Sequence, residues 1–198
     1  MSNEDFSVTQ EVDELHAVII FNIELSKESD RGCVLLAASY LDNCLKDLLE
    51  ANCIDDKDGF NDLCNGTSPL ASFSGKIELC YLLGLISPDA KRYLHLIRKI
   101  RNDFAHSMEI ISFSTERVAN RCRNLRMEAF PKDMDSPRDI FMTASFGIAG
   151  YLMGQRDSSE KPSIGKDSFG NLEQHKAYMN GKGNKLKDAI IDRYYLND

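Results

Sequence analysis

The sequence predicts an all-α protein, with one helical-bundle domain of about six to seven helices followed by a flexible C-terminal tail. Apolar residues recur at spacings of three and four over most of residues 8–155, as on the buried face of a helix. No alternation of apolar and polar residues continues beyond four residues, so no strand is expected. After Gln155 the composition shifts to Ser, Gly, Lys and Asp, which predicts a polar tail over residues 156–198, partly disordered or marginally helical.

The first half of the domain is expected to contain helices over residues 8–26, 30–52 and 72–83. Asp30 is a candidate N-cap for the second helix, and Gly84 follows the third as a terminator. An aspartate-rich loop and a short turn over residues 60–64 are expected between these two helices. The apolar stripe of the second helix consists of Val34, Ala37, Ala38, Leu41, Cys44, Leu45, Leu48 and Leu49.

Two Ser-Pro pairs mark helix starts in the second half, because a capping serine followed by a first-turn proline is a strong start signal. Ser87-Pro88 predicts a helix that continues into residues 101–106, and Ser136-Pro137 predicts a helix to about Met153. The apolar residues 108–113 are expected to form a buried connector. The remaining expected helices are one capped by Ser114 or Thr115 that ends near Met127, and two short ones over residues 172–179 and 185–196.

Length, hydropathy and cysteine usage limit the class of protein. With 198 residues, 42% of them hydrophobic, the chain can bury a core without disulfides. No apolar run reaches 18 residues and the acidic N-terminus does not resemble a signal peptide, so a cytoplasmic protein without a membrane span is expected. The six cysteines include no CxxC pair, which favours reduced thiols packed as small hydrophobes over a zinc site. No phosphate-binding loop or dinucleotide fingerprint occurs, so no cofactor is expected.

The net charge of −7 is unevenly distributed. Residues 1–30 carry eight acidic side chains against Lys27, whereas residues 91–126 carry nine Lys or Arg against three acids. A local basic surface can attract phosphate groups even on an acidic protein. A solvated helix face explains the same charges, and the sequence leaves both interpretations open.

Residues 101–106, Arg-Asn-Asp-Phe-Ala-His, place a guanidinium, an amide, a carboxylate and an imidazole within six positions. On a straight helix, Arg101 and His106 project about 140° apart. They can meet at one substrate atom only if the helix ends near Phe104, or if a second copy of the chain contributes one of them. An active composite site would therefore imply a homodimer.

The Arg101–His106 segment allows two interpretations. An imidazole that exchanges protons near neutral pH and a guanidinium that stabilises phosphate charge could cleave RNA through its own 2′-hydroxyl, with Asn102 orienting either group. Alternatively, His106 contacts the last carbonyls of the helix and Arg101 pairs with an acid such as Asp42. Spacing alone favours this structural role.

Arg117 and Arg121 lie one turn apart, on the face of their expected helix that points away from the core. By themselves they are typical of a solvated face. If they lay beside Arg98 and Arg101, they would extend a phosphate-binding patch.

Four blocks of sequence, in order across about residues 10–155, carry a resemblance. They are residues 31–50, residues 69–77 with the following 83–86, residues 95–107 and residues 136–141. Together they resemble the mannitol operon repressor family, named for repressing mannitol uptake and catabolism genes in enteric and related bacteria. The resemblance implies an all-helical fold and a role in transcriptional regulation, but it brings no recognisable helix-turn-helix. Regulation through a protein partner is therefore at least as well supported as direct operator binding.

The pattern Arg101-Asn102-x3-His106 is also similar to the Arg-Asn-x3-His motif of HEPN domains, helical modules that often dimerise. Many of these domains are metal-independent ribonucleases, and others bind only nucleotides or partners. The resemblance implies catalytic roles for Arg101 and His106, with Asn102 in support.

These features together predict a non-enzymatic transcriptional regulator of the mannitol operon repressor type. It is expected to form a homodimer and to act through protein partners, nucleic acid or both. A HEPN-type metal-independent endoribonuclease or RNA-binding module is the alternative. The expected partner- or phosphate-binding residues are Arg98, Arg101, Asn102, His106, Arg117 and Arg121.

Overall fold

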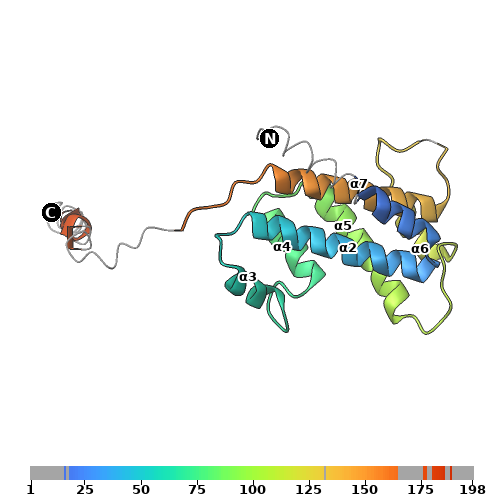
Figure 1. The fold of residues 1–198 in the computed structure, drawn as a ribbon, viewed down its shortest axis with the longest axis horizontal. Helices are drawn as coiled ribbons and strands as arrows, with labels where there is room; N and C mark the ends of the chain where they lie inside the picture. The colour runs from blue at the N-terminus through green and yellow to red at the C-terminus, as the bar shows by residue number, and fades with distance from the viewer. Residues whose placement is uncertain are drawn as a thin grey trace, which may run out of the picture. The chain divides into compact units, whose positions relative to one another are not determined.

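The structure, a computed structural model, describes residues 16, 18–131, 133–164, 176–177, 180–185 and 188. These residues form helices and loops and include no strand, which confirms the predicted all-α class. The chain divides into two compact units, Met1–Pro162 and Ser163–Asp198. The first unit contains α2 (Asp30–Ala51), α3 (Lys57–Cys64), α4 (Phe73–Leu82), α5 (Pro88–His106), α6 (Glu116–Arg123) and α7 (Pro137–Asp157) (Figure 1).

The two long helices α2 and α7 lie side by side and run in the same direction (Figure 1). Their starts are joined by Arg138, whose guanidinium donates to the Asp30 carboxylate at 2.6 Å. Their ends are joined by the Asn52 side-chain amide, which donates to the Ser159 hydroxyl at 2.8 Å. Contacts at both ends fix the register of the pair.

Helix α5 runs opposite to α2 and α7 and contacts both. The Ser87 N–H, just before α5, donates to the Tyr151 hydroxyl near the end of α7. At the other end, Arg31 in the first turn of α2 donates to the Ser107 carbonyl that follows α5. Helix α4 packs against α2 and α5, and α6 packs against α5 and α7. The second half of α5 borders α2 and the start of α4 at one pocket and contacts α6 through Asp103.

The predicted stripe of α2 lies in the core, and of its residues only Cys44 is half-buried instead of buried; the other helices and residues 111–113 also contribute core side chains. On α5, Leu94 is fully buried whereas Tyr93 is half-buried. The centre of the buried face is thus rotated from the expected direction by roughly 40° towards Arg101. This rotation places the Arg101 side chain at the edge of the core.

The start of α2 corrects one expectation. Ser29, not Asp30, is the N-cap, because its hydroxyl reaches the Gly32 N–H at 3.1 Å. The Asp30 carboxylate accepts instead from the Phe113 N–H at 3.0 Å and from Arg138. Asp30 therefore joins distant segments of the fold.

The segment after α5 is a second correction, since only part of it is a buried connector. Ile111 and Phe113 are buried, but the side chains of Met108 and Ile110 are fully exposed. The chain leaves the surface of the bundle after His106 and returns at Ile111. An apolar run in the sequence does not by itself indicate burial in a loop.

Several element ends also differ from expectation. Asp56 caps α3 through the Gly59 N–H, so this helix begins before the predicted turn. Helix α6 ends at Arg123, earlier than expected, and α7 continues to Asp157. Residues 18–27 are helical, as predicted, while residues 8–15 and most of residues 172–179 and 185–196 lie outside the described residues. No helix within the described residues is long and apolar enough to cross a membrane.

Candidate functional site

The Arg101–His106 segment is held in a regular helix. The Ser87 hydroxyl accepts from the Ala90 N–H at 3.2 Å, and Pro88 occupies the first turn, so α5 begins where the sequence predicts. The helix continues without a break to His106, and the Ser107 N–H donates to the Asp103 carbonyl at 3.1 Å. Side chains in this segment therefore project as they do on a straight helix.

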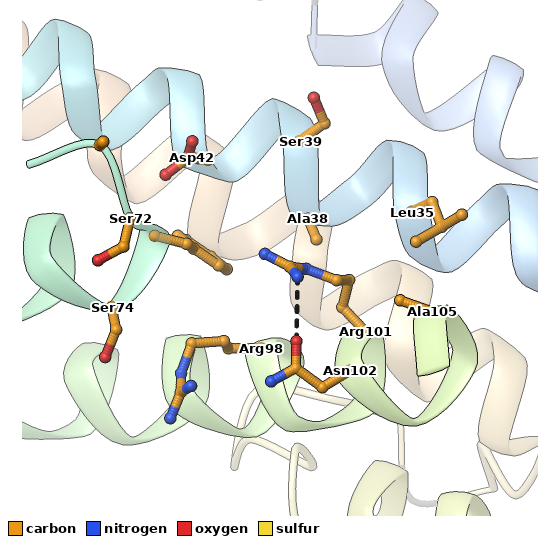
Figure 2. Close-up of a pocket in the computed structure, with 12 residues that line it drawn as sticks. Leu35, Ala38, Ser39, Asp42, Ser72, Ser74, Arg98, Arg101, Asn102 and Ala105 are labelled. Carbon is orange, nitrogen blue, oxygen red and sulfur yellow. Dashed lines mark hydrogen bonds between the residues drawn. The ribbon is translucent and has the colours of Figure 1, made fainter. Parts of the chain in front are cut away.

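Arg98, Arg101 and Asn102 line one pocket, with a volume of about 500 Å³, between α2, α4 and α5. Figure 2 shows the Arg101 guanidinium in the space between α2 and α5, with Arg98 and Asn102 on α5 and the α4 start at Ser72 and Ser74 nearby. Ser39 and Asp42 reach the pocket from α2. The remaining lining residues are Leu35, Ala38, Ala71, Phe73 and Ala105.

The charges in this pocket are incompletely paired. Lys76, which is 4% exposed, binds both carboxylate oxygens of Asp42 at 2.9 and 3.0 Å. The expected alternative of an Arg101–Asp42 pair is therefore wrong, because Lys76 already occupies that carboxylate. Arg101 donates to the side-chain carbonyl of Asn102 at 3.0 Å, and no described carboxylate pairs with it. The Nε atom of Arg98 is buried and lacks a hydrogen-bond partner among the described residues.

His106 lies apart from the pocket. It is exposed, it is the last residue of α5, and it is not among the residues that line the pocket. Because the helix does not end near Phe104, the angle between Arg101 and His106 stays at about 140°. Within one chain, their side chains do not converge on a common point.

The other two predicted arginines belong to a different side of α5. Arg121 of α6 forms an ion pair with Asp103. Asp103 projects roughly 160° from Arg101 around the helix. Arg117 is exposed on α6. The six predicted site residues are thus divided: three line the pocket, and the other three are found elsewhere on α5 and α6.

The pocket also contains polar residues that the sequence did not indicate as a binding set. Ser39, Ser72 and Ser74 line the pocket, and none of them has the sequence context of a nucleophile. The start of α4 at Ser72 was predictable, and a helix N-terminus presents free N–H groups to anions. The meeting of this helix start with the arginines of α5 depends on tertiary packing.

The remaining titratable groups do not supply an obvious nucleophile or metal site. Burial raises the pKa of Cys33 to about 11 and the pKa values of Cys44, Cys80 and Cys122 to about 12, so these thiols stay protonated near neutral pH. All six cysteines are free. Among the described residues, no three His, Cys, Asp or Glu side chains gather in a way that could hold a metal ion.

The fold is similar to that of a chain in the X-ray structure of the MtlR-HPr complex from Escherichia coli. The TM-score is 0.52 at 15% sequence identity, and the match covers 67% of this chain and 98% of that chain. No protein-family model and no curated protein sequence matches the chain. The similarity supports the fold that the four sequence blocks imply.

Proposed function

We propose that this chain is a non-enzymatic regulatory protein of the mannitol operon repressor type, which acts in the cytoplasm by binding a protein partner. The observation that carries the proposal is the separation of Arg101 from His106: one borders a pocket and the other is exposed outside it. A metal-independent ribonuclease of the HEPN kind needs both groups at one phosphate. Within one chain, this geometry favours binding over cleavage.

A protein partner is supported by the structural neighbour, because MtlR is there in complex with HPr. This chain also presents apolar surface of its own beside the end of α5. Met108 and Ile110 are 104% and 102% exposed, as much as in an unfolded chain. Burial of two fully exposed apolar side chains against a partner is favourable, and methionine adapts well to such a contact. We infer that the loop over residues 107–110 contacts the partner.

Binding is tested with the full chain and purified Escherichia coli HPr by isothermal titration calorimetry. We expect Met108→Ser/Ile110→Ser to weaken binding at least about ten-fold, because a central apolar contact typically contributes more than 1 kcal/mol. Leu82→Ser, which removes an exposed apolar side chain at the end of α4, is the matched control. Absence of HPr binding by wild type, or equal loss in the control, would reject this partner surface.

The alternative function, a ribonuclease, is tested separately by an RNA cleavage assay. RNA is incubated with wild type, Arg101→Ala and His106→Ala in the presence of a chelator, and the products are resolved on a gel. Cleavage by wild type that is lost in both variants would replace the regulatory proposal by a ribonuclease that brings His106 from a second copy. Light scattering on the same samples measures whether the expected homodimer forms.

A further inference from the structure

The pocket between α2, α4 and α5 contains positive charge that its own residues do not neutralise. Arg98 and Arg101 are its cationic lining residues, and neither pairs with a carboxylate in the described part of the chain. The single acid of the pocket, Asp42, is bound on both oxygens by Lys76. Two guanidinium groups that border one pocket without a carboxylate partner leave positive charge there, which favours a bound anion.

The donors of these arginines are also incompletely used. A guanidinium has five N–H groups, and a buried one normally has an acceptor. The buried Nε of Arg98 has none among the described residues, and the Arg101 guanidinium makes only one bond, to Asn102. Planar guanidinium groups with free N–H groups match the oxygen geometry of phosphate.

The start of α4 adds donors on another side of the same pocket. The Ser72 hydroxyl accepts from the Gly75 N–H at 3.0 Å, which leaves the N–H groups of Phe73 and Ser74 without an acceptor in the described residues. Such first-turn N–H groups, together with the helix dipole, favour an anion. Figure 2 shows Ser72 and Ser74 at the start of α4, on the side of the pocket next to Arg98.

Apolar side chains form part of the pocket wall. Leu35 and Ala38 on α2 and the buried Phe73 on α4 all line it. Its volume of about 500 Å³ is in the range of small-molecule sites and exceeds what a single inorganic anion requires. The pocket therefore fits a ligand with one anionic group and an organic part.

From this combination we infer that the pocket binds a small organic phosphomonoester, with its phosphate between Arg101, Arg98 and the start of α4, and its organic part against Leu35 and Phe73. The inference goes beyond the proposed function, because it assigns a small-molecule ligand to a site separate from the loop over residues 107–110. A phosphate dianion matches the two unpaired guanidinium charges, whereas a carboxylate would neutralise one.

The test uses the full chain with inorganic phosphate, phenyl phosphate and benzoate at constant ionic strength. Binding is measured by ¹H–¹⁵N NMR, with the Arg side-chain Nε–Hε signals and the Ser74 amide as reporters. We expect phenyl phosphate to bind about ten-fold more tightly than inorganic phosphate, because its ring is removed from water. Benzoate is expected to bind more weakly than phenyl phosphate.

Three variants locate the site. Arg101→Gln is expected to weaken phenyl phosphate binding by at least about ten-fold, since it removes a charge-assisted contact. Arg101→Lys keeps the charge without the fork of donors and should bind with intermediate affinity. Arg117→Gln removes an exposed arginine on α6, outside the pocket, and should bind as wild type does. Far-UV circular dichroism confirms that each variant is folded.

Other outcomes would overturn the inference. These are absence of saturable phenyl phosphate binding, equal weakening by Arg117→Gln, equal affinity for benzoate, or equal affinity for inorganic phosphate. An RNA oligonucleotide that binds more tightly than phenyl phosphate and depends on Arg101 would also overturn it, in favour of nucleic acid. The HPr test uses variants of the loop over residues 107–110, and the phenyl phosphate test uses variants of the pocket. HPr binding can therefore persist when phenyl phosphate binding fails, and phenyl phosphate binding can persist when HPr binding fails.

Discussion

The two sides of α5 differ in how their arginines are paired with acidic side chains. On the side that faces α6, Arg121 and Asp103 neutralise each other, and the pair lies between two packed helices. On the side that faces α2 and α4, Arg98 and Arg101 lack an acid partner, because Lys76 occupies the available carboxylate of Asp42. The same residue type therefore has a structural role on one side and is available for binding on the other.

This comparison also separates stability from ligand binding. Removal of a buried cation is costly when it leaves a buried carboxylate without a counter-charge. A half-exposed cation without a carboxylate partner contributes little to the free energy of folding. Substitutions of the paired cations Lys76 and Arg121 should therefore lower the free energy of unfolding more than substitution of Arg101, which has no carboxylate partner among the described residues.

The largest effect is expected from Lys76→Met. Lys76 is 4% exposed, and its removal leaves the half-buried Asp42 carboxylate without a counter-charge. We expect a loss of about 2 to 3 kcal/mol in the free energy of unfolding, measured by urea denaturation. Asp42→Asn in the Lys76→Met background should recover part of this loss. If Lys76→Met alone were as stable as wild type, the Lys76–Asp42 pair would not be what holds Asp42 in place at the pocket.

A smaller loss is expected from Gly75→Ala in the first turn of α4. A Cβ atom at Gly75 would lie 2.3 Å from the Pro69 carbonyl oxygen, so the loop that borders the pocket would have to move. We expect a loss of about 2 kcal/mol in the free energy of unfolding, together with weaker phenyl phosphate binding. Gly150→Ala in α7, where no atom lies within 4 Å of the added Cβ, is the control. There alanine should stabilise the helix by about 0.5 to 1 kcal/mol.

The third effect compares the two sides of α5 directly. Arg121→Gln should lower the free energy of unfolding by about 1 kcal/mol, because Asp103 is only 18% exposed and loses its partner. Arg101→Gln should change it by less than about 0.5 kcal/mol. Both are measured by urea denaturation under the same conditions. Equal losses in the two variants would remove the distinction between a structural side and a binding side.

The sequence predicted the starts of α5 and α7 and the buried face of α2 correctly, because each of these features has a local signal. The capping serine and proline before α5 and α7, and the apolar stripe of α2, depend only on neighbouring residues. The start of α4 near Ser72 was predicted from the apolar content of the segment, and Ser72 is its N-cap.

The candidate site was predictable only in part. Periodicity placed Arg98 and Arg101 on one part of α5, but it could not show that Lys76, from another helix, takes the Asp42 carboxylate. It also could not show that Arg121 packs against Asp103 instead of extending a basic strip. Both outcomes depend on how helices distant in sequence are packed against each other.

The smallest effect concerns Glu78, the acid that α4 presents to another part of α5. Hydrogen bonds from Lys91 and His95, at 2.7 and 2.9 Å, lower the pKa of Glu78 below its ordinary 4.5. Because the folded-state pKa is the lower one, the contribution to stability is present above about pH 4.5 and is lost as pH falls through the folded pKa. We expect Glu78→Gln to lower the melting temperature slightly at neutral pH, and to melt like wild type in stronger acid.

Glu128→Gln, at an exposed position after α6, is the matched control and should melt like wild type at every pH. If Glu78→Gln differed from wild type equally at neutral and acid pH, its effect would come from packing and not from the carboxylate charge. The cations of α5 next to Glu78 would then not depend on an acid for their placement. In that case, the Glu78 carboxylate charge would add no stability beside Lys91 and His95, and a missing carboxylate beside Arg98 and Arg101 would likewise cost the fold little.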